Sequence, residues 1–456
     1  MARTVSVGTQ DFEQLIIERC FYIDKTDFIK EWWESKDAVT LITRPRRFGK
    51  TLNMNMLEHF FSVKYKGKGE IFEGLDIWEE KSPNGDYKYR KLQGTYPVIF
   101  LSFAGLKETT YETAVYRMCQ IIKMVYKRYL FLAESDVLTE EEKKEYRKLT
   151  AEVVQQDAPM ALYVLSDYLY RYYGRKVIIL LDEYDAPLQE AYVSGYWNEM
   201  VFFTRNLFNS TFKTNPYLER AVMTGLTRVS KESLFSDLNN IKVVTMASDK
   251  YASCFGFTEE EVFAAMDEFG LENKEEVKRW YDGFTIGNRT DIYNPWSIIN
   301  FLDEGKLKPY WANTSSNGLV SQLVREGDKE IKILFEELLQ GHSIVKELDE
   351  EIVFNQLGED QDAVWSLLLA SGYVTAIRVE EEEYELVLTN YEVKKMFYKM
   401  VKSWFGRDRA VYNGFVRALL RDDLEEMNNY MEEMADSMFG TFDGGNKPSE
   451  KRTPEG

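Results

Sequence analysis

Short apolar segments alternate with amphipathic stretches along the first 256 residues of the chain. The apolar segments are rich in β-branched residues, which is typical of buried strands, and the stretches between them have helical spacing. Residues 176–182 are the most apolar segment, as expected for a central strand of a parallel sheet. The alternation predicts an α/β domain with right-handed crossovers. The predicted strands are residues 39–43, 96–103, 176–182, 220–224 and 242–246.

The pattern becomes mainly helical after residue 257. Thr258 precedes three glutamates, which is the signature of a capped helix start, and aromatic-rich helical segments continue to about residue 345. Aromatic residues of this region, such as Trp280 and Trp296, could form a base-stacking surface, but packing inside the region is the commoner role of such residues. We therefore predict a helical lid that follows the α/β domain.

The last part of the chain predicts a small domain with a β-hairpin. Residues 373–379 and 384–388 alternate like two strands, and the acidic residues 380–383 lie between them as the hairpin tip. An apolar helix precedes the hairpin at 363–371, and another helix starts near Asn390. The order helix, hairpin, helix predicts a winged-helix-like domain. Its acidic tip would repel nucleic-acid phosphate, which favours a protein-facing or packing role over DNA contact.

Composition and charge exclude several classes of function. The formal net charge is −19, so the chain repels nucleic acid over most of its surface, and any DNA contact would need a local basic patch. No apolar run reaches the length of a membrane span, and the N-terminus has no signal core, so we expect a cytoplasmic protein without a membrane partner. Two histidines and three widely spaced cysteines argue against Ser-His-Asp catalysis, His-rich metal sites and a disulfide framework.

The loop after the first predicted strand carries a nucleotide-binding pattern. It ends in Gly49, Lys50 and Thr51 at the start of a helix, which is the strand–loop–helix context of a P-loop (Walker A). Backbone N–H groups of such a loop bind phosphate oxygens, Lys50 would reach the β- and γ-phosphates, and the Thr51 hydroxyl would ligate Mg²⁺. The alternative is an ordinary exposed loop before a helix. The candidate nucleotide-binding residues are Arg44, Pro45, Arg46, Arg47, Phe48, Gly49, Lys50 and Thr51.

The basic residues of this loop depart from the usual pattern. Arg44 stands where a P-loop normally has glycine, which relieves a steric constraint at that turn. Pro45 could fix the loop instead by locking its own φ. The three arginines around Pro45 could add positive charge for phosphate, or could pair with acidic residues after the third predicted strand.

Those acidic residues form the second element of the site. Asp182 and Glu183 end the most apolar strand, in the position of a Walker B motif. Asp182 would hold Mg²⁺ through water, and Glu183 would polarise the attacking water as a general base. An acidic turn after a buried strand is the alternative, but both motifs occur in the correct order at strand ends, where ligands bind in open α/β sheets. Thr224 and Arg228 follow at the next predicted strand, as candidate contacts of the γ-phosphate or as a strand residue and a surface arginine.

The motif strings resemble a known family. Residues 44–51 (RPRRFGKT), 181–188 (LDEYDAPL) and 224–228 (TGLTR) are similar to recurring segments of the predicted AAA-ATPase (AAA-ATPase-like) family of bacteria and archaea, as are 22–26 (YIDKT) and 280–284 (WYDGF). Residues 238–240 and 293–297 add to the resemblance, which covers nearly the whole chain. In that family arginine at the position of Arg44 is usual. Many relatives carry a C-terminal PD-(D/E)xK nuclease-like domain, which we expect to be absent here because no such residue set follows residue 405.

The resemblance and the motifs together predict the fold. It is an α/β protein with a P-loop NTPase parallel-sheet core, a helical lid and a small winged-helix-like C-terminal domain. We predict an N-terminal segment packed on the core (1–35), an AAA-like P-loop ATPase domain (36–256), the lid (257–345), the winged-helix-like domain (346–436) and a disordered linker or tail (437–456).

The expected function is ATP binding with Mg²⁺, and ATP hydrolysis that drives or gates a partner or a nuclease acting in trans. The alternative is a nucleotide-gated switch or scaffold with little turnover, and a DNA-stimulated motor is a third possibility that the acidic charge disfavours. The sequence leaves open ATP against GTP, the partner and the oligomeric state.

Overall fold

A computed structural model describes residues 2–227, 239–311, 320, 323–324, 327, 329–348, 363–379, 383–404, 418, 425–427 and 429–430. The chain divides into two compact units, Met1–Lys394 and Lys395–Gly456. Everything described below lies in the first unit, apart from the end of the last helix. The finer division into five segments stays a prediction, and residues 437–456 lie outside the described part of the chain.

The core of the first unit is a five-stranded, all-parallel sheet with the strand order β2-β3-β4-β1-β5. This confirms the predicted α/β fold with a parallel sheet, and each of the five predicted strands is present. The P-loop strand β1 and the acidic strand β3 are not neighbours, because β4 lies between them. The strands are β1 Val39–Thr43, β2 Val98–Ser102, β3 Val177–Asp182, β4 Leu218–Gly225 and β5 Ile241–Val244.

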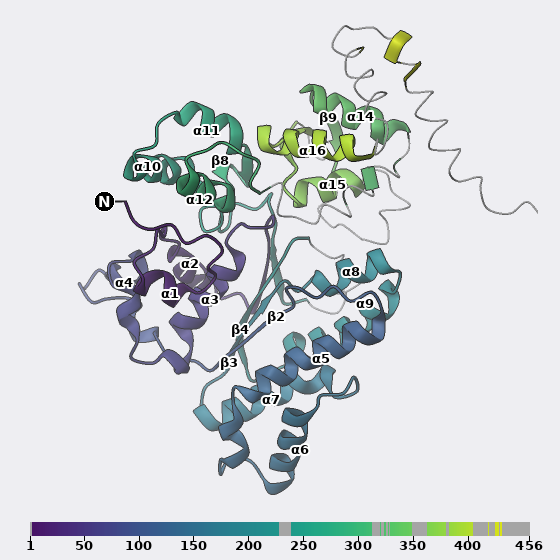
Figure 1. The fold of residues 1–456 in the computed structure, drawn as a ribbon. Helices are drawn as coiled ribbons and strands as arrows, with labels where there is room; N and C mark the ends of the chain where they lie inside the picture. Colours follow the sequence, from purple (N-terminus) through teal and green to yellow (C-terminus); the bar gives the residue numbers. More distant parts are fainter. Residues whose placement is uncertain are drawn as a thin grey trace, which may run out of the picture. The chain divides into compact units, whose positions relative to one another are not determined.

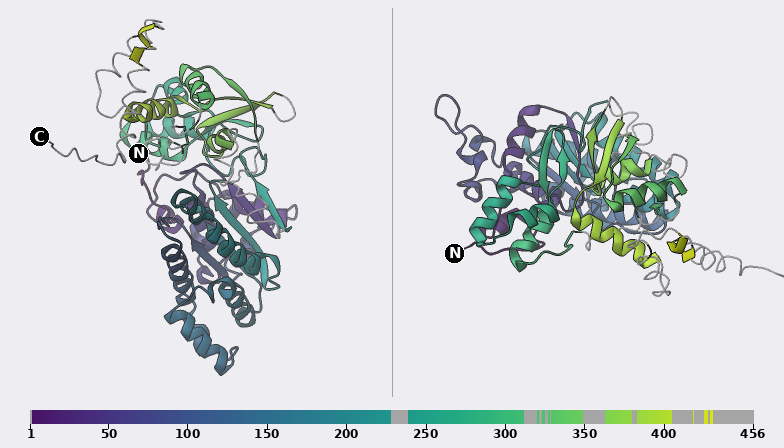
Figure 2. Two further views of the ribbon diagram at one scale, coloured as in Figure 1. Left: turned by 90° about the vertical axis from the view of Figure 1, so that its right-hand side faces the viewer. Right: turned by 90° about the horizontal axis from the view of Figure 1, so that it is seen from above.

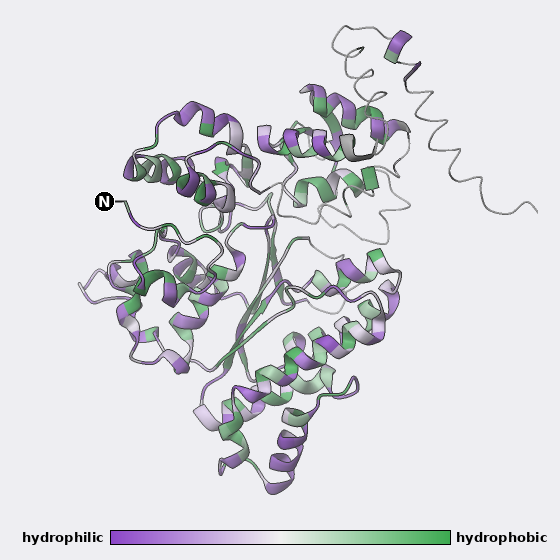
Figure 3. Cartoon of the chain, viewed as in Figure 1, coloured by the Kyte–Doolittle hydropathy of each residue, from purple (hydrophilic) through white to green (hydrophobic). Residues whose placement is uncertain are grey.

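Alternate side chains of each strand enter two different apolar cores. Ile178 and Leu180 of β3 pack in one core, and Ile179 and Leu181 pack in the other, because successive side chains of a strand point to opposite faces. Helices flank the strands in Figure 1 and in the two views of Figure 2. Figure 3 shows that apolar residues predominate along the strands, as burial on both faces requires.

The two layers of helices come from different parts of the sequence. One layer is N-terminal and contains α1 Phe12–Ile17, α2 Asp27–Ser35, α3 Lys50–Phe61 and α4 Asp76–Glu79, with 3-10 turns η1 Val63–Tyr65, η2 Gly69–Phe72 and η3 Arg90–Leu92. The other contains α5 Tyr111–Lys127, α6 Glu140–Ala151, α7 Ala158–Tyr173, α8 Ala186–Ser194 and α9 Trp197–Phe208, with η4 Leu130–Glu134 and the π-helical turn η5 Asn209–Lys213. Phe12, Phe28 and Trp32 of the N-terminal segment are fully buried in the first layer.

The lid region combines helices with a small antiparallel sheet of order β6-β8-β7, which the sequence did not predict. Thr258 caps its first helix through a capping box with Glu261, as the pattern of glutamates predicted. The elements are β6 Phe257–Thr258, α10 Glu259–Phe269, α11 Lys274–Tyr281, β7 Phe284–Ile286, β8 Arg289–Tyr293 and α12 Pro295–Glu304.

The predicted hairpin is present in the C-terminal part of the first unit. Strands β10 and β11 pair antiparallel, and β9 adds a third strand in the order β10-β11-β9. Residues 380–382 of the acidic tip lie outside the described residues, and Glu383 begins β11. The sequence also predicts an acidic helical stretch around residues 346–362, but most of it lies outside the described residues, and residues 346 and 347 belong to β9 instead. The elements are α14 Lys329–Gln340, β9 Ile344–Glu347, α15 Ala363–Ala370, β10 Val374–Arg378, β11 Glu383–Leu388 and α16 Tyr391–Trp404.

Candidate functional site

The loop between β1 and α3 forms a turn that exposes backbone N–H groups at the start of a helix. Gly49 adopts φ 83° as the N-cap of α3, and no side chain caps this helix end. Arg47 also lies in the left-handed region, with φ 66°. Such a turn at an uncapped helix N-terminus is suited to bind an anion, because the N–H groups and the helix dipole both favour negative charge.

Lys50 is a buried cation at the centre of this loop. Its side chain is 5% exposed, and Nζ donates to the carbonyl oxygens of Arg44 (2.9 Å) and Pro45 (3.0 Å). Among the residues that the structure describes, it forms no ion pair within 4 Å. Burial lowers the pKa of Lys50, and nearby Glu183 and Asp182 oppose that shift. A buried ammonium held only by neutral carbonyls fits a site whose counter-charge is a bound phosphate.

Asp182 is the centre of a buried hydroxyl network. Its Oδ2 accepts from Thr51 Oγ1 (2.8 Å) and Ser102 Oγ (3.2 Å), and its Oδ1 accepts from Thr224 Oγ1 (2.6 Å). Burial raises the pKa of Asp182 and Glu183 adds to the rise, whereas the hydroxyls of Thr224 and Thr51 lower it. The network holds the Thr51 hydroxyl beside a carboxylate, which is the pair of oxygen ligands that Mg²⁺ takes in such sites.

Sequence reasoning missed Ser102. It ends β2 and pairs in register with Asp182, the last residue of β3. A hydroxyl at the carboxyl end of a predicted parallel strand was the available signal, but the strand order was needed to make these two residues neighbours.

Glu183 follows Asp182 in a bent backbone conformation. Its φ is 52°, a region that costs a non-glycine residue roughly 1 kcal/mol or more. The bend is fixed on its far side, where Tyr184 N donates to the Thr224 carbonyl (2.9 Å). As a result the Glu183 side chain lines the cavity, whereas Asp182 lies behind the cavity wall.

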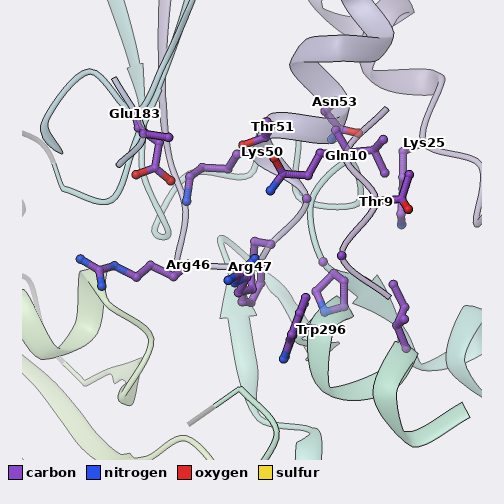
Figure 4. Close-up of a pocket in the computed structure, with 18 of the residues that line it drawn as sticks. Thr9, Gln10, Lys25, Arg46, Arg47, Lys50, Thr51, Asn53, Glu183 and Trp296 are labelled. Atoms are coloured by element: carbon purple, nitrogen blue, oxygen red, sulfur yellow. The ribbon is translucent and has the colours of Figure 1, made fainter. Parts of the chain in front are cut away.

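A cavity of about 470 Å³ lies over the loop and the start of α3, within the size range of small-molecule sites. The structure brings most of the predicted site residues to it (Figure 4), namely Arg46, Arg47, Phe48, Gly49, Lys50, Thr51 and Glu183. Asp182 and Thr224 are fully buried behind it, and Arg228 lies outside the described residues. Figure 4 also shows lining residues that the sequence did not predict, among them Thr9, Gln10 and Lys25 from the N-terminal segment.

The three arginines of the loop have different roles. The Arg44 side chain is fully buried away from the cavity and donates to the carbonyls of Thr43 (2.9 Å), Thr245 (2.7 Å) and Lys250 (3.3 Å). Burial lowers its pKa to about 10. Arg46 Nη2 donates to Gln189 Oε1 (3.3 Å), and the Arg47 guanidinium lies 4.4 Å from the ring centroid of Trp296. Arg44 therefore supports the loop from behind, and Arg46 and Arg47 face the cavity.

The lid region touches this loop directly. Asn294 Nδ2 donates to the Arg46 carbonyl (3.2 Å), and the rings of Phe48 and Phe284 meet edge to face at 4.9 Å. Gly372, between α15 and β10, approaches Pro45 so closely that an added Cβ would lie 2.9 Å from Pro45 Cγ. The loop therefore contacts both the lid region and the residues just before β10.

Lys25 connects the N-terminal segment to the first lid helix. Its side chain is almost fully buried, and Nζ donates to both carboxylate oxygens of Glu261 (2.7 Å each) and to the Ser253 carbonyl (2.9 Å). Glu261 is the capping-box residue of α10, so this ion pair fixes the start of the lid beside the cavity. Lys25 belongs to the YIDKT segment, but the sequence does not predict its contact with Glu261.

Comparisons with known proteins identify a family and a relative. A family model described as "Predicted AAA-ATPase" matches residues 6–235. The chain is also similar to a protein of Azotobacter chroococcum mcd 1 described as "Uncharacterized protein in vnfD 5'region", with 24% identity over 400 residues. That match covers 86% of this chain and 68% of the relative. No helix within the described part of the chain is both long enough and apolar enough to cross a bilayer.

Proposed function

Since the chain belongs to the predicted AAA-ATPase family, we propose that it binds ATP with Mg²⁺ in the cavity over α3 and hydrolyses the bond to the terminal phosphate. The observation that carries this proposal is the buried Lys50 ammonium, which has no ion pair among the described residues and lies beside the Asp182 hydroxyl network. A triphosphate would supply the direct ion pair that Lys50 does not form with the described residues. Cytoplasmic location and a protein or nuclease partner in trans belong to the same proposal.

Each residue has a separate part in this proposal. The N–H groups at the start of α3 and the Lys50 ammonium bind phosphate oxygens. The Thr51 hydroxyl and Asp182 would hold Mg²⁺, which would neutralise charge on the phosphates when bound. Glu183 accepts the proton of the attacking water as general base, and its position on the cavity wall supports this role. Thr224 holds Asp182, and Arg228 is kept as a proposed contact of the γ-phosphate.

Two substitutions test the site. Lys50→Ala should abolish ATP binding measured by titration calorimetry, because it removes the only lysine ammonium in the centre of the loop. Glu183→Gln should keep binding and slow phosphate release, because the amide cannot accept the water's proton. Lys127→Ala and Glu199→Gln, at exposed positions of α5 and α9, are matched controls. Unchanged ATP affinity in the Lys50 variant would reject the assignment.

The contacts of the loop with the lid favour a second candidate, a nucleotide-gated switch with little turnover. Asn294, Phe284 and Trp296 all touch the loop, so a bound nucleotide could be read by the lid without rapid hydrolysis. Steady-state phosphate release separates the two functions. Release on the order of 1 per second or more supports the hydrolase and rejects the inert switch. Stimulation of phosphate release by DNA at low salt would instead support a DNA-stimulated motor. Competition of GTP with ATP for the site would measure the preference for the base.

A further inference from the structure

Gln189 of α8 bridges the P-loop and a buried aspartate. Its Nε2 donates to Asp185 Oδ2 (2.9 Å), and its Oε1 accepts from Arg46 Nη2 (3.3 Å). A guanidinium can only donate and an ionised carboxylate can only accept, so the amide has one orientation that satisfies both partners. Gln189 therefore connects the Asp185 carboxylate to Arg46, whose side chain lines the cavity.

Asp185 is rigidly held on its other side. It is 1% exposed, and the same Oδ2 accepts from Leu226 N (3.0 Å), Thr227 N (2.9 Å) and Thr227 Oγ1 (3.1 Å). The approach of the two segments is so close that a Cβ on Gly225 would lie 2.7 Å from Asp185 Oδ1. Asp185 thus joins the turn after β3 to the backbone after β4, and it gives Gln189 a fixed anchor.

Arg46 lies at the end of the cavity where the terminal phosphate is expected. Figure 4 shows Arg46 and Glu183 on one side of Lys50, and Thr9 and Lys25 on the opposite side. A general base must lie beside the phosphate that is attacked, so the Glu183 side is the γ-phosphate side of the site. The Arg47 guanidinium, by contrast, stacks on Trp296 of the lid.

We propose that Arg46 contacts the γ-phosphate and makes the site prefer ATP to ADP, and that Gln189 and Asp185 are positioning residues for this contact. The inference rests on the proposed nucleotide function of the cavity. A planar guanidinium donates two parallel hydrogen bonds to phosphate oxygens, which a lysine at the same position cannot do. The γ-phosphate is present in ATP and absent in ADP, so the contact discriminates between the two nucleotides.

The test measures ATP and ADP dissociation constants in the Glu183→Gln chain, which keeps ATP intact. Arg46→Gln should weaken ATP binding about 10- to 100-fold and change ADP binding less than about threefold, as for loss of a charged hydrogen bond. Arg46→Lys should recover part of the ATP affinity. Gln189→Leu should lower the ATP-to-ADP preference by a smaller factor and should have no further effect in the Arg46→Gln background, because the two residues act as one unit.

Controls separate this inference from general damage to the site. Arg117→Gln, at an exposed position of α5, and Gln155→Leu, outside the cavity, should leave both dissociation constants unchanged. The inference would be overturned if Arg46→Gln lost ATP and ADP affinity equally, or if the effects of the Arg46 and Gln189 variants were additive. It would also be overturned if Arg47→Gln alone shifted the ATP-to-ADP preference. In those outcomes Lys50-dependent ATP binding would persist, so the proposed function would stand. Loss of nucleotide binding from the parent chain itself would instead reject both.

Discussion

Thr224 Oγ1 donates to Asp182 Oδ1 at 2.6 Å, between the carboxyl ends of the neighbouring strands β4 and β3. Thr224 is fully buried and does not line the cavity. Its structural role is therefore to fix one oxygen of Asp182, while Thr51 and Ser102 fix the other. The strand order explains this pairing, because β4 lies between the P-loop strand and the acidic strand.

We predict that Thr224→Val slows ATP hydrolysis more than it weakens ATP binding. Valine has the shape of threonine but cannot donate to Asp182, so the carboxylate loses a bond that lowers its pKa and fixes its orientation. The expected fall in kcat is about 10- to 100-fold, because the hydrogen bond from Thr224 to the Asp182 carboxylate is lost. The Mg²⁺ concentration needed for half-maximal activity should also rise. Thr224→Ser should keep most of the rate. Phosphate release at several Mg²⁺ concentrations measures both effects.

Thr40→Val is the matched control for this prediction. Thr40 lies on β1, is fully buried, and its Oγ1 has no hydrogen-bond partner among the described residues. The same substitution there should leave the rate unchanged and should not destabilise the protein. A Thr224→Val variant with wild-type kcat and Mg²⁺ dependence would contradict the role assigned to Thr224.

A second prediction concerns Arg44, at the position where P-loops usually have glycine. Its φ is not in the left-handed region, so glycine is not needed there, and its guanidinium bonds three carbonyls from two segments. We predict that Arg44→Gly, although it restores the usual pattern, lowers the free energy of unfolding by about 3–5 kcal/mol through lost packing and unpaired carbonyls. Urea unfolding measures this, and ATP affinity should fall as well.

Arg19→Gly provides the comparison for that substitution. Arg19 is exposed and already adopts φ 54°, which glycine tolerates better than arginine, so the free energy of unfolding should stay nearly constant. If Arg44→Gly binds ATP more tightly and unfolds at the same urea concentration as the wild type, the supporting role of Arg44 is wrong.

The sheet was predictable from sequence, but parts of the lid were not. The five core strands are apolar and β-branched because both of their faces are buried, so each is visible in the pattern. The lid strands β7 and β8 are short, and β8 begins with Arg289, Thr290 and Asp291, so no alternation marks them. Strands β7 and β8 are stabilised by tertiary packing, because Phe284 contacts Phe48 of the P-loop and also Trp311.

The candidate site also contains residues that the sequence predicted and residues that it did not. Lys50, Thr51 and Asp182 were predicted because each belongs to a motif whose chemistry depends on adjacent residues. Ser102 and Gln189 become neighbours of the site only through strand register and a helical turn, so no local spacing indicates them. The sequence also did not predict that the Arg44 side chain points into the protein. A basic loop residue is ordinarily exposed, whereas Arg44 is fully buried.

A third prediction concerns the pH dependence of stability in the lid. Asp282 lies among Glu259, Asp291 and the Lys278 ammonium, which donates to Asp291 (2.8 Å) and is 3.8 Å from Asp282. The Asp282 side chain is 12% exposed, and its Oδ1 has no hydrogen-bond partner in the described part of the chain. Burial, with a smaller contribution from Asp291, raises the pKa of Asp282 to about 7.

The sign of the effect follows from proton binding. Between pH of about 4 and 7 the folded protein keeps a proton on Asp282 that the unfolded chain has released, so the contribution of Asp282 to the free energy of unfolding falls as pH rises through this window. Asparagine has nearly the same shape and cannot ionise. Asp282→Asn should therefore match the wild type near pH 4 and unfold at a higher urea concentration above pH 7. Asp303→Asn, at an exposed position of α12, should keep the wild-type profile, and a wild-type profile in Asp282→Asn as well would show that Asp282 ionises without cost in the folded lid.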